Sequence, residues 1–158
     1  MKVKKEVKFI FMLLLIIPVF SGCSGKGDTA DRTEIDISSL GSELLEKAEF
    51  EDELNLVDDT MVKKLYHIEE FTGAQVYIGS GATAEEIAVF EFDSGEAAEE
   101  GLKAAEDRLE GQKEDFASYV PKELQKLDNA VIKQAGKYLV VCVSNSDEAE
   151  KIIKKYIK

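Results

Sequence analysis

The chain has 158 residues, of which 44% are hydrophobic and 33% are charged, and its formal net charge at pH 7 is −12. This length suits one domain with a single hydrophobic core, and this composition argues against intrinsic disorder. A surface this acidic repels the phosphate backbone of nucleic acids and other anionic polymers, so we expect no nucleic-acid partner.

The first predicted element in chain order is a secretory signal. Residues 1–8 contain four lysines and one glutamate, and an uncharged apolar run follows from Phe9 to Phe20. A basic start, an apolar run and then small residues are typical of a signal peptide. The run is shorter than the about 20 residues that a membrane-spanning helix needs. Pro18 also disfavours a continuous helix.

The end of this run, Phe20-Ser21-Gly22-Cys23, resembles the lipobox of bacterial lipoproteins, although Phe20 stands where leucine is usual. The resemblance implies that residues 1–22 are a lipoprotein signal peptide and that Cys23 becomes the acylated N-terminus. Its acyl chains, such as palmitate, then hold the protein on the extracytoplasmic face of the cell membrane. Each buried CH₂ group contributes about 0.8 kcal/mol, so two or three chains anchor stably. The alternative is an ordinary secreted protein with a free cysteine or a disulfide.

The remaining cysteine, Cys142, lies in the apolar run KYLVVCVS. If Cys23 is acylated, Cys142 has no partner for a disulfide, and we expect it to pack in the core as a small hydrophobic residue. Removal of residues 1–22, with their four lysines and one glutamate, leaves a net charge of −15. A solvated acidic face is the simplest interpretation of this charge, and a cationic ligand or Ca²⁺ is the alternative.

Residues 23–36 are mostly polar or small and lack apolar periodicity, which predicts a flexible tether before a single domain at residues 37–158. Two short amphipathic helices are expected at the start of this domain. Ser38 or Ser39 caps the first, and Asp58 or Asp59 caps the second. The apolar positions expected to pack inward are Leu40, Leu44, Leu45, Ala48, Met61, Val62, Leu65 and Tyr66.

The second half of the chain predicts two β-hairpins, in the runs AQVYIGSGATAEEIAVFEF (74–92) and NAVIKQAGKYLVVCVS (129–144). Helix starts follow near Ser94 and Ser146, which are 52 residues apart. This common offset favours a ββα pseudo-repeat over coincidence. We therefore expect an α+β domain in which the two hairpins form one four-stranded antiparallel sheet with helices packed on it.

Both of these helices are expected on the same face of the sheet, because each has an apolar stripe that needs cover. The residues expected to be nearly inaccessible there are Leu102, Leu109, Ile153, Val89 and Val141. Cys142, one position out of phase with Val141, then belongs to the opposite face. The N-terminal helices should cover that face, to which we also assign Phe90, Phe92 and Val140.

Few residues suggest chemistry. The run GSGATAEE lacks the Gly-Lys-Ser/Thr ending of a phosphate-binding loop and joins two predicted strands, so a hairpin turn is expected. The paired acidic residues, such as Glu85 with Glu86, lack the spacing of a calcium loop, and neither a metal nor a cofactor is predicted. The weak binding candidates are Tyr66, His67, which is expected at a helix end, and Tyr119, for which packing before Pro121 is favoured over ligand contact.

Several pieces of sequence, in order behind the lipobox, together resemble a known family. They are KLYHI (64–68), GSGATAEEIAVFEF (79–92), Arg108 followed by Gln112, SYVPKEL (118–124) and AGKYLVVCVS (135–144). The chain resembles the small Gram-positive lipoproteins that carry the domain of unknown function numbered four-three-five-eight. The resemblance implies an extracytoplasmic, membrane-anchored domain with no established activity.

Two classes of function follow. The first is a non-catalytic binding or interaction module, held at the membrane by acylated Cys23, for a protein, peptide or cell-envelope partner. The alternative is a small extracytoplasmic hydrolase that uses His67 or a pair of carboxylates. Since the sequence has no nucleophile, metal or cofactor signature, the binding module is favoured.

Overall fold

The structure is a computed structural model that describes residues 34–157. The predicted signal peptide, Cys23 and most of the predicted tether lie outside these residues. The elements are α1 (Ile37–Lys47), β1 (Asn55–Leu56), α2 (Asp59–Tyr66), β2 (Gly73–Ile78), β3 (Glu86–Glu91), α3 (Gly95–Tyr119), the 3₁₀ helix η1 (Pro121–Glu123), α4 (Leu124–Asp128), β4 (Val131–Ala135), β5 (Tyr138–Val143) and α5 (Glu148–Tyr156). None of the helices in the described part of the chain is long and apolar enough to cross a bilayer.

The strands form one antiparallel sheet in the order β1-β2-β3-β5-β4. The two predicted hairpins are β2 with β3 and β4 with β5, and they join through β3 and β5 at the centre of the sheet. The predicted α+β class and single antiparallel sheet are thus confirmed. The sheet has five strands, however, because Asn55 and Leu56 add a short edge strand beside β2. Two residues are too few to show an alternating pattern in the sequence.

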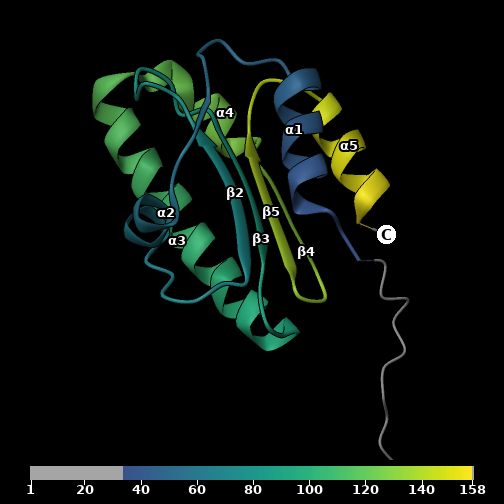
Figure 1. The fold of residues 1–158 in the computed structure, drawn as a ribbon. Helices are drawn as coiled ribbons and strands as arrows, with labels where there is room; N and C mark the ends of the chain where they lie inside the picture. Colours follow the sequence, from purple (N-terminus) through teal and green to yellow (C-terminus); the bar gives the residue numbers. More distant parts are fainter. Residues whose placement is uncertain (1–33, 158) are drawn as a thin grey trace, which may run out of the picture. The chain divides into compact units, whose positions relative to one another are not determined.

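Helices cover both faces of the sheet (Figure 1). On one face, α2, α3 and α4 pack on a cluster that includes Phe90, Phe92 and Val141. On the other face, α1 and α5 pack on a cluster that includes Val89 and Cys142. The fold therefore has three layers, with the sheet in the middle.

The expectation that the helices starting near Ser94 and Ser146 share one face is wrong. The cause is the alternation of side chains along a strand. Val89 in β3 lies on the α1 side, whereas Val141, which is 52 residues later in β5, lies on the α3 side. Equivalent positions of the proposed repeat therefore face opposite sides of the sheet. The helices that follow them also pack on opposite faces, so the 52-residue offset does not relate two structurally equivalent ββα units.

Most of the predicted core is confirmed in its burial but not in its grouping. Leu109, Ile153, Val89 and Val141 are buried, whereas Leu102 is half-buried. Cys142 is buried opposite Val141, as expected. Its cover differs from the expectation, because α1 and the C-terminal α5 cover it, whereas α2 packs on the other face. The phenylalanines lie on the other face from the one expected, because Phe90 and Phe92 are on the α3 side. Of the three residues assigned to the face of Cys142, only Val140 lies there.

The helix starts are set by local side-chain caps. The carboxylate of Asp36, rather than Ser38 or Ser39, accepts from two amides of the first turn of α1, at 3.0 and 3.1 Å. Ile35 is buried beside this cap, so the last residues of the predicted tether belong to the folded domain. Asp58 caps α2 and Ser94 caps α3, as the sequence predicts.

Candidate functional site

A buried ion pair joins β3 to α3. Glu86, the first residue of β3, has a side chain only 1% exposed on the α3 side of the sheet. The guanidinium of Arg108 donates to both of its oxygens, with 3.1 Å between Nε and Oε1. The hydroxyl of Tyr66 donates to Oε1, and the amide of Gln112 donates to Oε2 at 3.4 Å. A buried carboxylate is thus surrounded by donors from two helices, as its burial requires.

The elements supply these donors at regular positions. Tyr66 is the last residue of α2, while Arg108 and Gln112 are one turn apart on α3 and so project from one side of that helix. The guanidinium also lies over the Tyr66 ring, 5.0 Å from its centre. Burial, and then the charge of Glu86, raises the pKa of Tyr66 well above its usual value, so its hydroxyl remains a donor. The cluster fixes α2 and α3 on the end of β3.

A second buried cluster surrounds Glu85, the residue directly before Glu86. The ammonium of Lys126, on α4, is 2% exposed and lies 3.0 Å from Glu85 and 3.1 Å from Glu123, both buried. Glu85 also accepts from the backbone amides of Glu51 and Asp52, at 2.9 Å each. This cluster therefore ties the segment after α1 and the short helix α4 to the loop between β2 and β3.

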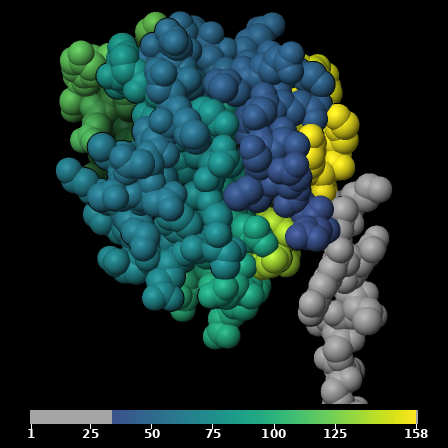
Figure 2. All heavy atoms as spheres, viewed as in Figure 1, coloured from purple at the N-terminus to yellow at the C-terminus, as the bar shows by residue number. Residues whose placement is uncertain are grey.

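Two hollows open beside these clusters. The first, of about 440 Å³, lies between the β2–β3 loop and the second half of α3, and it is lined by Ile78, Thr83, Phe116 and Tyr119 among others. The second, of about 530 Å³, lies between the end of α2 and α3 and includes His67, Asp107 and Gly111. Both hollows share Arg108, Gln112 and Asp115. We call them together the α3 hollows. Figure 2 shows this side, with α2 in blue and the second half of α3 in green.

The hollows combine three kinds of groups. Asp115 is an exposed carboxylate on the border of both. Tyr119, at the end of α3, is 74% exposed. The side-chain oxygen of Gln112 is buried and has no hydrogen-bond partner among the described residues, which leaves an acceptor available. This arrangement suits a ligand group that donates hydrogen bonds or carries positive charge.

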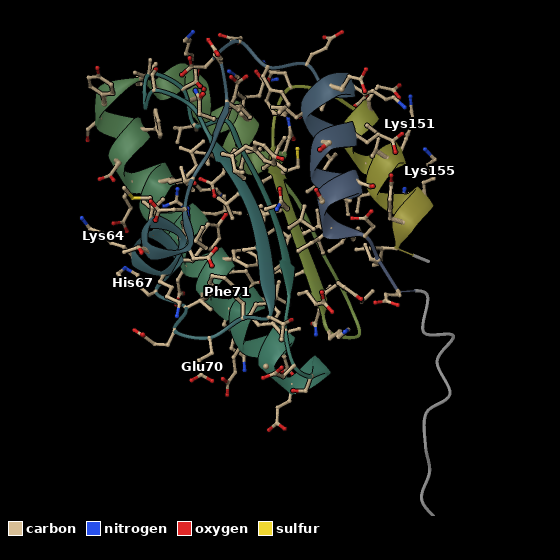
Figure 3. The ribbon with its side chains drawn as sticks, in the orientation of Figure 1. Lys64, His67, Glu70, Phe71, Lys151 and Lys155 are labelled. Carbon is tan, nitrogen blue, oxygen red and sulfur yellow. The ribbon has the colours of Figure 1, made fainter. Side chains whose placement is uncertain are left out.

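The three candidate residues from the sequence all border these hollows, but in different roles. Tyr66 is buried and forms part of the Glu86 cluster. His67 is exposed at the end of α2, with a left-handed backbone (φ 54°), as expected for a helix end. Figure 3 shows it on the opposite side of the sheet from Lys151 and Lys155 of α5. The packing favoured for Tyr119 is wrong, because Phe116, one turn earlier, takes the inward position.

Sequence patterns indicate only part of this site. Arg108 and Gln112 are indicated only by the family resemblance, and no pattern in the sequence indicates Lys126. The available signal was the pair Glu85-Glu86 directly before an apolar strand, since buried carboxylates need nearby cations or donors. In the described part of the chain, no group of three or more His, Cys, Asp or Glu side chains is placed to hold a metal ion.

Comparison with known proteins gives one match. A family model described as a domain of unknown function (DUF4358) matches residues 46–144, which span β1 to β5 and include both buried clusters. A search of the curated proteins and a search of the solved structures each returned no match.

Proposed function

Since the chain belongs to the DUF4358 family of domains of unknown function, we propose its role from its own residues: a lipid-anchored, extracytoplasmic binding module whose ligand site is the α3 hollows. The lipobox ending in Cys23 supports the anchor. The observation that carries the binding role is Tyr119, a large aromatic side chain that is 74% exposed and lines the first hollow together with Gln112 and Asp115. Exposed aromatic groups beside fixed polar groups are typical of ligand sites.

The geometry favours binding over the hydrolase alternative. Glu86 is engaged by Arg108 and Tyr66, and Glu85 is engaged by Lys126, so each carboxylate serves as a structural partner. Glu85 and Glu86 line the first hollow and Arg108 lines both, so the two clusters hold parts of these walls in place. A site with fixed walls binds with less loss of conformational freedom.

A thermal-shift screen of the full-length chain in detergent tests this role. The ligands are amines, polyamines and short cell-wall peptides. A ligand that binds only the folded state raises Tm by mass action. We expect Tyr119→Ala and Asp115→Asn to reduce this shift. Glu106→Gln, which removes one charge from the exposed side of α3, should leave it unchanged.

Two outcomes would contradict the proposal. A ligand whose shift is the same in the wild type, Tyr119→Ala and Asp115→Asn binds elsewhere on the protein. Turnover of ester or amide substrates that is abolished by His67→Ala would instead favour the hydrolase.

A further inference from the structure

The edge of the sheet at β1 exposes apolar side chains on both of its faces. Leu56 is 57% exposed and Met61, in the following helix, is 43% exposed. Together with Tyr119 they are the large hydrophobic residues that are exposed in the described part of the chain. Two such residues at a single sheet edge suggest that the edge is covered by another polypeptide.

The register of β1 leaves part of its backbone free to pair. Leu56 lies opposite Tyr77, and the neighbouring Val57 donates its amide to Val76 at 2.9 Å. Because hydrogen-bonded and non-hydrogen-bonded pairs alternate in an antiparallel ladder, the N–H and C=O of Leu56 point away from β2. β1 ends the strand order, so no strand of the described sheet lies on that side.

The two faces of this edge differ. The side chain of Leu56 lies on the face of its partner Tyr77, which belongs to the α1 side. On the other face, a groove of about 530 Å³ is formed by Val57, Met61, Leu65 and Ile78. A strand added beside β1 alternates its side chains between these two faces and covers both apolar surfaces.

The charged residues that line this groove are Asp52 and Glu53, both acidic. Asp52 accepts from the backbone amide and the hydroxyl of Ser80, at 2.7 and 2.6 Å. These hydrogen bonds lower the pKa of Asp52, so its carboxylate stays ionised, and the bond from the Ser80 hydroxyl has the largest effect. The edge thus combines an apolar groove with fixed negative charge.

We propose that the β1 edge and its groove, here called the β1 dock, bind an extended, basic segment of a partner protein. The backbone of the segment pairs with Leu56, and its apolar side chains cover Leu56 and enter the groove beside Met61. Its lysine or arginine side chains meet Asp52 and Glu53. Addition of a strand at an exposed edge is a general mode of peptide recognition. This dock is a second surface, beyond the α3 hollows of the proposed function.

Charge complementarity decides between this occupant and a second copy of the chain. A second copy would bring another acidic chain, with Asp52 and Glu53 beside its own β1 edge, against this acidic groove. Like charges at an interface are unfavourable, and the whole chain already carries a net charge of −12. A basic segment relieves this charge instead.

The test uses the full-length chain, labelled with ¹⁵N in detergent, and a short synthetic peptide that alternates lysine and valine. We expect binding that weakens with added salt and that protects the Leu56 amide from hydrogen exchange. Leu56→Lys and Met61→Lys should each weaken binding about tenfold or more, which is about 1.4 kcal/mol. Thr60→Lys adds the same charge to an exposed position of α2 outside the groove lining, and it should change the affinity by less than about twofold.

Four results would overturn the proposal: no binding of the lysine–valine peptide, equal binding of a glutamate–valine peptide, equal weakening by all three variants, or chemical shift changes confined to α3. Concentration-dependent dimers abolished by Leu56→Lys would identify a second copy as the occupant. Slow hydrogen exchange of the Leu56 amide in the peptide-free monomer would instead identify the chain's own N-terminal segment as the occupant of the dock. Since Tyr119 and Asp115 lie outside the dock, the thermal-shift test of the α3 hollows is decided separately.

Discussion

At the scale of single residues, the pairing of Glu86 with Arg108 should make a large contribution to stability. Replacement by Arg108→Met leaves a buried carboxylate without its cation, and such losses cost about 3–5 kcal/mol. Lys103→Met removes an exposed partner of Glu99, 3.8 Å away, and should cost less than about 1 kcal/mol. Urea unfolding of both variants measures this difference in the free energy of unfolding. Equal losses would mean that the buried pair contributes no more than a surface pair.

The thiol of Cys142 is a second residue whose chemistry follows from burial. Burial raises its pKa to about 12, so the reactive thiolate is scarce at pH 8. We expect slow reaction with a thiol reagent in the folded protein and fast reaction in denaturant, measured with Cys23→Ala, in which Cys142 is the remaining cysteine. Fast reaction of the folded protein would show that β5 opens or that Cys142 is accessible.

The partners in the two buried clusters are far apart in the sequence, so local sequence patterns do not reveal them. Glu86 and Arg108 are 22 positions apart, and Glu85 and Lys126 are 41 apart. Charged residues on amphipathic segments are usually solvated, so nothing local distinguishes Arg108 and Lys126 from exposed neighbours such as Lys103. The acid-rich α3 shows where a helix forms, but not which of its charges becomes buried.

At the scale of elements, the packing of α3 on the sheet depends on a close approach at Gly101. A Cβ atom there lies 2.3 Å from Cζ of Phe92, whereas one at Gly111 meets nothing within 4 Å. We expect Gly101→Ala to lower the free energy of unfolding by about 1–3 kcal/mol through overpacking. Gly111→Ala should raise it by up to about 1 kcal/mol through helix propensity. Gain of stability in both variants, measured by denaturation, would contradict the packing of α3 on Phe92.

The contact between α1 and α5 should depend on pH. Glu43 of α1 accepts from Lys155 and Tyr156 of α5 and from Lys47, each at 2.7 Å. These hydrogen bonds lower the pKa of Glu43 from 4.5 to about 2, and the bond from Lys155 has the largest effect. Because the pKa is lower in the folded state, the stabilisation is present above pH 4.5 and is lost as the pH falls towards 2.

A comparison of variants measures this effect. Tm of the wild type should fall more between pH 5 and pH 2 than Tm of Glu43→Gln, which has no carboxylate to protonate. Glu46→Gln, on the exposed side of the same helix, should follow the wild type. An identical decline in all three proteins would rule out a stabilising role for Glu43.

The types of the longer elements were predictable from the sequence, whereas the faces of the sheet that they cover were not. The caps at Asp58 and Ser94 and the turn at Gly136, with φ 55°, are local signals, and they marked the helices and hairpins. All residues of β5 are buried, and so are five of the six in β3. A strand that is apolar on both faces has no alternation to show which side a helix covers.

At the scale of the whole molecule, the family match covers the sheet and both buried clusters but leaves the activity open. The α3 hollows and the β1 dock lie on surfaces built by α2, α3 and the sheet edge. A binding role for these surfaces is useful at the cell envelope only if the chain is held there. The proposed binding role at the membrane therefore depends on the acylation of Cys23.

Intact-mass and peptide mass spectrometry of the chain purified from host membranes tests this claim most directly. We predict that residues 1–22 are absent and that Cys23 carries a diacylglyceryl group. We also predict that Cys23→Ala appears as the uncleaved precursor or is released from the membrane. A chain that retains residues 1–22, or that begins at an unmodified Cys23 thiol, would contradict the account.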